Sequence, residues 1–411
     1  MLQYMQLFRP LNLAFMALML LLLRYFLIAP LYQLAGISHS LNDFQFLLLI
    51  ISVVSIAAGG YLINDYFDQR TDQINKPEKA MIGQAISANK AIQIYGILTA
   101  LGILLGTYLA FQVGSFRLVS VHIFSAALLW FYSASLQRKP LVGNLAVSLL
   151  LSIAVFTVVF FDAALVVALK AQMKTWFLGV ISMLANTEIP NNIWENIDNR
   201  DVKQFILQYV GAYAVFAFLL NLVREIVKDI EDIDGDRRAN YNTFPIWAGT
   251  PFAKLFATAL VLLTFKLLFD FQLSQYQLDD KITPILVLVF LQIPLLYLAF
   301  RLFRADFKED FKHISNILKV VMFFGLMYLP YFSSTIAVEE ENMLGNIELP
   351  EGVSIDDVQF INFDTPSDDI DTTLIDTTAV FDPIDTITTI IDENIKLNKA
   401  DDGINIQLNP E

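Results

Sequence analysis

The chain contains no cysteine among its 411 residues. That absence excludes a disulfide framework, a thiolate metal site, an iron–sulfur cluster and a cysteine nucleophile. The three histidines, His39, His122 and His313, are isolated from one another, so a histidine-cluster metal site is not expected either. Charged residues make up only 17% of the chain and apolar residues 56%, with a mean hydropathy of +0.55. Soluble globular proteins carry about 25% charged residues, so this composition is typical of a membrane protein.

The net charge of −14 comes from one end of the chain. Residues 336–411 contain 19 acidic and 2 basic residues, a net charge of −17, whereas residues 1–335 contain 22 acidic and 25 basic residues, a net charge of +3. The acidic tail is rich in Asp, Thr and Ile. Because like charges repel and oppose compaction, we expect it to be a solvated, disordered extension. The alternative is that its closely spaced carboxylates bind calcium or a partner protein.

Nine hydrophobic stretches in residues 1–335 approach the roughly 20 residues that a helix needs to cross a bilayer. They are residues 11–29, 44–63, 91–112, 116–133, 141–161, 205–223, 252–269, 283–303 and 314–334. We therefore predict an all-α polytopic membrane domain over residues 1–335, followed by the tail at 336–411. Residues 162–204 alternate short apolar and polar pieces, which predicts an insertion with an interfacial or re-entrant part.

The distribution of basic residues predicts the orientation in the membrane. Nine spans place the two termini on opposite sides, and the loops on the N-terminal side hold sixteen Lys and Arg against eight on the other side. Cytoplasmic loops carry the excess of Lys and Arg. We therefore expect an integral protein of the cell inner membrane, with a cytoplasmic N-terminus and the acidic tail on the opposite side.

The loops after the second and the sixth stretch each open with an acidic cluster on the predicted cytoplasmic side. At 3.6 residues per turn, the members of each cluster share one helical face if the preceding helix continues through them. Gly235 is a possible end of the second of these helices, before Asp236. The first cluster is Asn64, Asp65, Asp68 and Asp72, and the second is Asp229, Asp232 and Asp236, with Glu225 one turn earlier.

Carboxylates crowded at a membrane boundary require a compensating cation. Mg²⁺ takes oxygen ligands and commonly binds through one or two carboxylates together with substrate phosphates. Two facing clusters would hold a pair of such ions, which would clamp a diphosphate and make it a better leaving group. Basic residues near the clusters would neutralise phosphate charge, or would serve only the orientation in the membrane. They are Lys76, Lys79, Arg138, Lys139, Arg237 and Arg238.

Four segments resemble the UbiA family of intramembrane prenyltransferases. Asn64-Asp65-x-x-Asp68-x-x-x-Asp72 resembles the first signature of that family, and residues 228–237 resemble the second. Residues 132–144 resemble a third recurrent segment, and Arg9-Pro10-x-Asn12 resembles the start of the first helix. The resemblance covers about residues 5–335. It implies a nine-helix bundle whose central cavity opens laterally to the bilayer, magnesium as cofactor and a polyprenyl diphosphate donor.

The resemblance also implies roles for individual residues. Asn64, Asp68, Asp72, Asp232 and Asp236 would hold magnesium and the diphosphate. The predicted catalytic residues are those four aspartates and Asp229. The predicted substrate-binding residues are Arg9, Asn12, Asn64, Asp65, Lys79, Tyr132, Arg138, Lys139 and Arg237. The chain departs from the family pattern at Lys79, where an Arg is common, and at Gln137, where a Lys is common.

The predicted reaction is magnesium-assisted loss of diphosphate from a geranylgeranyl-type donor in a cavity that excludes water, followed by attack of a lipophilic acceptor. Residues 224–232 are most similar to the branch of the family that prenylates geranylgeranylglyceryl phosphate. An aromatic quinone precursor is the alternative acceptor. The protein is also expected to contact membrane lipid and no nucleic acid.

Two other classes of membrane protein place aspartates in a similar way. Residues 234–239 echo the start of the CDP-alcohol phosphotransferase signature, but Glu231 replaces its first aspartate and no aspartate follows before Asp270. An ion-coupled transporter usually carries its acidic residues in the middle of a span, whereas the clusters here lie at span ends. Both classes are therefore less favoured than a prenyltransferase.

Overall fold

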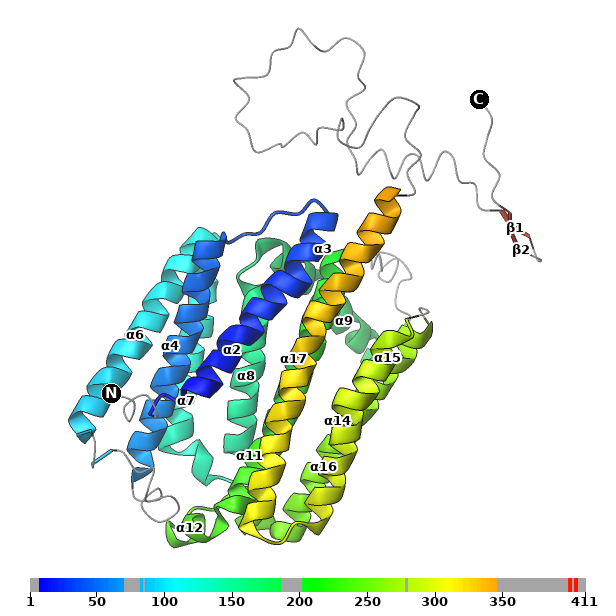
Figure 1. The fold of residues 1–411 in the computed structure, drawn as a ribbon. Helices are drawn as coiled ribbons and strands as arrows, with labels where there is room; N and C mark the ends of the chain where they lie inside the picture. The colour runs from blue at the N-terminus through cyan, green and yellow to red at the C-terminus, as the bar shows by residue number, and fades with distance from the viewer. Residues whose placement is uncertain are drawn as a thin grey trace. The chain divides into compact units, whose positions relative to one another are not determined.

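Figure 1 shows the computed structural model of the chain. The structure describes residues 7–69, 82–83, 86–185, 202–277, 280–345, 398–400 and 403–405. Contacts divide the chain into two units, Met1–Asn346 and Ile347–Glu411, which are described separately. The first unit holds the helices, and the second contains the acidic tail from Ile347 onward.

Nine helices in the described residues are long and apolar enough to cross a membrane. Each coincides with one of the nine predicted stretches, so the predicted all-α membrane fold is confirmed. Six are single helices: α4 (Asp43–Phe67), α6 (Ala88–Gln112), α8 (Val142–Phe160), α11 (Val202–Glu231), α14 (Thr250–Gln277) and α17 (Lys308–Gly345). Three are composite: α2 (Pro10–Leu23) with η1 (Arg24–Ile28) and α3 (Ala29–Leu34), η3 (Phe116–Leu118) with α7 (Val119–Ala134), and α15 (Ile282–Val287) with η5 (Leu288–Gln292) and α16 (Ile293–Arg304).

Two composite helices contain a π-helical turn, and each such turn precedes a proline. Pro30 is the second residue of α3 after η1, and Pro294 is the second residue of α16 after η5. Proline lacks an N–H group, and its ring clashes with the carbonyl of the preceding turn. The widened π turn accommodates the proline without ending the span.

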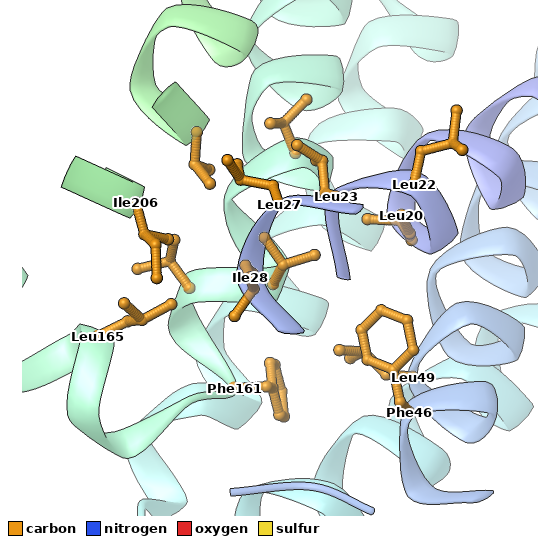
Figure 2. Close-up of a cluster of buried hydrophobic side chains, with 14 of the residues drawn as sticks. Leu20, Leu22, Leu23, Leu27, Ile28, Phe46, Leu49, Phe161, Leu165 and Ile206 are labelled. Atoms are coloured by element: carbon orange, nitrogen blue, oxygen red, sulfur yellow. The ribbon is translucent and has the colours of Figure 1, made fainter. Parts of the chain in front are cut away.

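The membrane helices form a closed ring. From α2 the ring passes to α4, then to α7, α8, α11, α14, α16 and α17, and α17 packs back against α2, while α6 covers α4 from outside. Buried apolar side chains form two large clusters, one around α2, α4 and the ends of α8 and α11, and the other between α11, α14, α16 and α17. Figure 2 shows part of the first cluster, to which the first span contributes Leu23 and Leu27 and α11 contributes Ile206.

The predicted insertion at 162–204 begins with a helix. α9 (Ala163–Ala185) joins the two short apolar pieces of this segment into one continuous helix, which packs against α8 and α11. Residues 186–201 lie outside the described residues, so the predicted interfacial or re-entrant part remains a prediction there.

Short helices connect the spans at the end of the ring where the acidic clusters lie. η4 (Leu136–Arg138) joins α7 to α8, and α12 (Ile233–Arg238) and α13 (Phe244–Ala248) join α11 to α14. In Figure 1, α12 and the start of α17 lie at the same end of the bundle, and α3 lies at the other. The connecting segments at this end therefore carry both predicted motifs.

The last helix and the tail differ in part from the prediction. α17 continues to Gly345, past the expected boundary at residue 335. Within the tail, β1 (Asn398–Ala400) and β2 (Gly403–Asn405) form an antiparallel hairpin in which Asn398 pairs with Asn405. The expected disorder of the other tail residues falls outside the described residues.

Candidate active site

A cavity of about 720 Å³ lies inside the ring of helices. Its size falls within the range of about 300–1,000 Å³ that is usual for small-molecule sites. Most of its wall is apolar, but polar and charged side chains gather where the acidic clusters lie, and we call this part the polar end. The polar end is lined by Arg9, Asn12, Tyr61, Asn64, Tyr132, Asn221, Arg224, Glu225 and Lys228.

The first acidic cluster begins where α4 stops. The helix ends at Phe67 and Asp68 is its C-cap residue, so the helical face expected to continue through Asp68 does not do so. Asn64 and Asp68 still meet, because Asn64 Nδ2 donates a hydrogen bond of 2.8 Å to Asp68 Oδ2. Asp72 lies outside the described residues.

Asp68 connects three segments that are distant in the sequence. Its Oδ1 accepts hydrogen bonds from Gln137 Nε2 at 2.7 Å and from the hydroxyl of Tyr241 at 3.4 Å. The Arg138 guanidinium lies 4.9 Å from the centre of the Tyr241 ring, and the Arg138 carbonyl accepts a 3.0 Å hydrogen bond from the backbone of Asn242. The segments that follow α4, α7 and α12 therefore meet at one carboxylate.

Gly143, in the first turn of α8, allows η4 to approach closely. A Cβ atom at this position would lie 2.7 Å from Gln137 Cα and 3.0 Å from Gln137 N. Both are backbone atoms, so a larger residue would displace the η4 segment. The contact between Gln137 and Asp68 thus depends on a glycine in the neighbouring helix.

The second acidic cluster lies at a break between two helices. α11 ends at Glu231 and α12 begins at Ile233, so the break falls at Asp232. The expectation that Gly235 could end the helix is wrong, because Gly235 is buried within α12. Lys308 Nζ, at the start of α17, lies 4.0 Å from Asp232 Oδ1. Asp236 is only 7% exposed.

The two clusters approach the same cavity: Asn64 of the first and Glu225 beside the second line it, although none of the described aspartates of the clusters does. Asp229 Oδ2 accepts a 2.8 Å hydrogen bond from Asn144 Nδ2 on α8, which fixes the carboxylate at the last turn of α11. Tyr132, which lines the cavity, interacts electrostatically with Asp68 of the first cluster and with Asp229 of the second. The structure therefore brings together two motifs that are more than 150 positions apart in the sequence.

Arg9 enters the polar end from the residue before α2. Its NH2 group donates a 3.0 Å hydrogen bond to Asp65 Oδ1, and its guanidinium lies 4.8 Å from the centre of the Tyr61 ring. Its backbone is left-handed, with φ 48° and ψ 61°, a conformation that is costly for a residue with a side chain. Burial acts to lower the pKa of Arg9, but the nearby carboxylate of Asp65 raises it, and the net pKa is raised.

Sequence reasoning missed a charged triplet on α11 as cavity residues. Glu225 Oε1 accepts a 2.7 Å hydrogen bond from Arg224 NH1, and Glu225 Oε2 lies 3.9 Å from Lys228 Nζ. The three side chains line the cavity, so they leave one net positive charge at the polar end. The sequence analysis placed Glu225 only on the same helical face as Asp229. The i, i+3 spacing between Glu225 and Lys228 is the signal that could have identified their ion pair. Tyr241 carried no such signal.

The structure divides the other predicted substrate-binding residues into two groups. Asn12, Asn64 and Tyr132 line the cavity together with Arg9. Lys139 and Arg237 are exposed and do not line the cavity. Lys79 lies outside the described residues.

The donor atoms near Asn64 fit a hard cation. Asn64 Oδ1 is buried and has no hydrogen-bond partner within the part of the chain that the structure describes, and it belongs to the residue that binds Asp68. Amide and carboxylate oxygens are ligands that Mg²⁺ accepts. Among the described residues, no three His, Cys, Asp or Glu side chains are grouped closely enough to hold an ion alone. Water and substrate phosphate would supply the remaining ligands, as is usual for Mg²⁺.

Comparison with known proteins gives consistent matches. The UbiA prenyltransferase family matches residues 13–326. A digeranylgeranylglyceryl phosphate synthase of Methanosphaera stadtmanae is 28% identical over 321 residues, covering 78% of this chain and 94% of that protein. The synthase of the same name from Ignicoccus hospitalis is 31% identical over 209 residues, and this match covers 51% of this chain and only 56% of that relative.

A solved structure of digeranylgeranylglyceryl phosphate synthase has the same fold. It aligns with a TM-score of 0.53 at 21% identity and covers 80% of this chain and 97% of that chain. The fold of this chain is therefore shared with a protein of known structure.

Proposed function

The chain belongs to the UbiA prenyltransferase family and is an integral membrane protein, and on that premise we propose that it transfers a geranylgeranyl-type group from a polyprenyl diphosphate to a prenylglyceryl phosphate-like acceptor. The observation that carries this proposal is the polar end of the cavity. There Arg9, Lys228 and Asn64 line one end of an apolar chamber, and Asn64 is hydrogen-bonded to the carboxylate of Asp68. The amide oxygen of Asn64 has no hydrogen-bond partner among the described residues. Such an arrangement suits a diphosphate attached to a hydrocarbon chain.

We propose that Mg²⁺ is the cofactor and that Asn64, Asp68, Asp72, Asp232 and Asp236 hold it together with the diphosphate. When bound, it would neutralise the diphosphate and make it a better leaving group. The chain itself prepares the carboxylate of Asp68 for this role, because Gln137 and Tyr241 orient it through hydrogen bonds. Arg9 supplies a planar donor that suits phosphate oxygens, and Lys228 supplies a point charge.

The apolar wall governs the fate of the prenyl group. Cleavage of the bond between the donor's first carbon and the diphosphate oxygen leaves an allylic cation, and exclusion of water prevents its hydrolysis. Tyr132 lines the cavity, and an aromatic ring there can stabilise such a cation through its π electrons. The acceptor hydroxyl oxygen then forms the new bond to carbon, and its proton passes to a carboxylate of the polar end.

The class of acceptor is proposed from the relatives. Curated proteins similar to this chain are named digeranylgeranylglyceryl phosphate synthases, which favours a glyceryl phosphate-like acceptor. An aromatic quinone precursor is the alternative. Purified protein with Mg²⁺, labelled geranylgeranyl diphosphate and a panel of both acceptor classes tests the choice. We expect a labelled diether product from the glyceryl phosphate acceptor, and prenylation of the aromatic acceptor alone would contradict it.

We also propose that the protein lies in the inner membrane with its active site on the cytoplasmic side. Residues 1–335 would form the catalytic domain, and the acidic tail would lie on the opposite side of the membrane. The excess of Lys and Arg in the loops on the N-terminal side supports this orientation. Protease added outside intact cells should remove the tail. Protection of the tail in intact cells, together with cleavage after lysis, would overturn the orientation.

A further inference from the structure

Among the described residues, Glu225 is the one acidic residue that lines the cavity. The described aspartates of the two clusters do not line it, and two of them are bound to other segments. Asp68 accepts a hydrogen bond from Gln137 of η4, and Asp229 accepts one from Asn144 of α8. A substrate in the cavity can therefore contact the carboxylate of Glu225 directly.

Glu225 lies where the polar end of the cavity meets the apolar chamber. It precedes Asp232, at which α11 breaks, by seven residues, or about 10 Å along the helix. Further along α11 in the other direction, the cavity is lined by Leu220, Ala217 and Phe216. The bond that breaks in the donor joins a diphosphate to a hydrocarbon chain. Such a bond fits best at this boundary between polar and apolar wall.

Two residues from other elements share this part of the cavity with Glu225. It interacts electrostatically with Tyr132 of α7 and with Arg9, which precedes α2. Both of these residues also line the cavity. Under the proposed function, Tyr132 stabilises the allylic cation and Arg9 binds the diphosphate. Glu225 therefore lies beside the place where the cation and the leaving group separate.

Two cations hold the carboxylate of Glu225, which is only 6% exposed. Arg224 NH1 donates a 2.7 Å hydrogen bond to Glu225 Oε1, and Lys228 Nζ lies 3.9 Å from Glu225 Oε2. A buried carboxylate needs such partners to stay ionised. A carboxylate has about four lone-pair positions on its two oxygens, so contacts with two cations are compatible with the uptake of a proton.

Formation of the ether bond requires a group that takes the acceptor's proton. The bond between the donor's first carbon and the diphosphate oxygen breaks, and its electron pair leaves with the diphosphate. The acceptor hydroxyl oxygen then bonds to that carbon and becomes a protonated ether, which is a far stronger acid than a carboxylic acid. Even an ion-paired carboxylate therefore takes the proton readily, and its removal prevents the acceptor from leaving again. The proton departs with the diphosphate when the products are released.

We propose that Glu225 is the general base that takes the proton of the acceptor hydroxyl. This inference rests on the proposed function and names the carboxylate that the reaction requires. Glu225 is then a catalytic residue that acts after the donor has ionised, whereas Asp68 acts on the departure of the diphosphate. Substitution of each residue should therefore affect a different step.

An isotope experiment on the full-length protein with Mg²⁺ and acceptor separates the two steps. The donor carries ¹⁸O in the oxygen between its first carbon and phosphorus, and each ionisation lets this label move to the other oxygens of the same phosphorus. For Glu225→Gln, we expect transfer to fall about a hundredfold while the label still moves at a rate within a few-fold of wild-type turnover. For Asp68→Asn, we expect both rates to fall together by about a hundredfold.

Glu309→Gln, at an exposed glutamate at the start of α17, is the matched control and should keep full transfer. Glu225→Ala provides a second test, because added formate can occupy the space of the lost carboxylate. Formate should raise transfer by this variant at least several-fold and should not rescue Asp68→Asn. Movement of the label in the Glu225 variants also shows that their active site is folded.

Wild-type transfer by Glu225→Gln would overturn the inference. An equal loss of transfer and of label movement would also overturn it, because Glu225 would then act on donor binding or ionisation. Absence of formate rescue in a Glu225→Ala protein that still moves the label would count against it in the same way. Failure of the wild-type protein to consume the donor with either class of acceptor would instead refute the proposed function.

Discussion

Each end of the helix ring holds an aspartate that is hydrogen-bonded to distant segments, but the two ends use it differently. At the end opposite the active site, Asp162 is 3% exposed, and its Oδ1 accepts hydrogen bonds from the Tyr32 hydroxyl at 2.7 Å and from the Leu165 backbone at 3.1 Å. Its Oδ2 accepts a longer bond of 3.5 Å from the backbone of Ser40. These donors join α3, the following loop and the start of α9, so the carboxylate holds the fold together.

At the polar end, Asp68 is held by side chains from two connecting segments, and the neighbouring Asn64 Oδ1 is left without a partner among the described residues. A buried acceptor that the protein does not satisfy is costly unless a ligand satisfies it. Both carboxylates accept hydrogen bonds at both oxygens, so the polar end is distinguished by the amide oxygen of Asn64, which no described residue satisfies and which a ligand can bind.

The largest effect should come from Asp68→Asn. This change removes a negative charge from the proposed metal and diphosphate site while keeping the shape of the side chain. We expect kcat/KM for prenyl transfer to fall by about a hundredfold or more, measured with labelled donor. The thermal midpoint of unfolding should change little. Asp270→Asn, at an exposed aspartate paired with Lys266, is the matched control and should keep full activity.

Asp162→Asn should have the opposite profile. The new amide NH₂ would face donors in place of the carboxylate, so the free energy of unfolding should fall by about 1–3 kcal/mol. Activity per folded molecule should remain close to that of the wild type. Denaturation in detergent micelles, combined with an activity assay normalised to folded protein, measures both quantities. Loss of activity without loss of stability would contradict the assignment of Asp162 as a structural residue.

Gly143→Ala should disturb the position of the Asp68 carboxylate indirectly, through Gln137. The new Cβ atom would push the backbone of Gln137 away, weaken its bond to Asp68 and lower kcat by about tenfold, or roughly 1.4 kcal/mol. Gly96→Ala on α6 is the matched control, since a Cβ there meets no atom within 4 Å and should leave kcat unchanged. Equal kcat in both variants would show that the position of η4 does not matter for turnover.

Tyr241→Phe should have the smallest effect. It removes one long hydrogen bond to Asp68 but keeps the aromatic ring beneath Arg138. Because Gln137 still holds the same oxygen at 2.7 Å, we expect kcat to fall only a few-fold, or about 0.5–1 kcal/mol. A loss as large as that of Asp68→Asn would mean that Tyr241 acts on the substrate directly.

The membrane spans were predictable because they depend on composition alone. Every one of the nine apolar stretches became a membrane-length helix, since a long run of apolar side chains has few alternatives in a bilayer. The link between Asn64 and Asp68 was also predictable, because a spacing of four residues brings side chains together on a helix.

Helix ends were less predictable. Nothing in the spacing of the acidic residues showed that α4 stops at Phe67 or that α11 breaks at Asp232 and not at Gly235. These ends depend on contacts with other segments, such as those that Asp68 makes with Gln137 and Tyr241. A period of 3.6 residues describes a helix but does not say where tertiary contacts end it.

The sequence by itself determined the class of fold, the family and the two acidic motifs, because these follow from hydrophobicity and from local spacing. Only the tertiary structure decided that Asn64 and Glu225 line the cavity and that Asp162 supports the fold at the opposite end. The physical reason is that a buried polar atom gains its role from the partners that distant segments bring to it or fail to bring. Those partners are settled by packing, which no local pattern in the chain records.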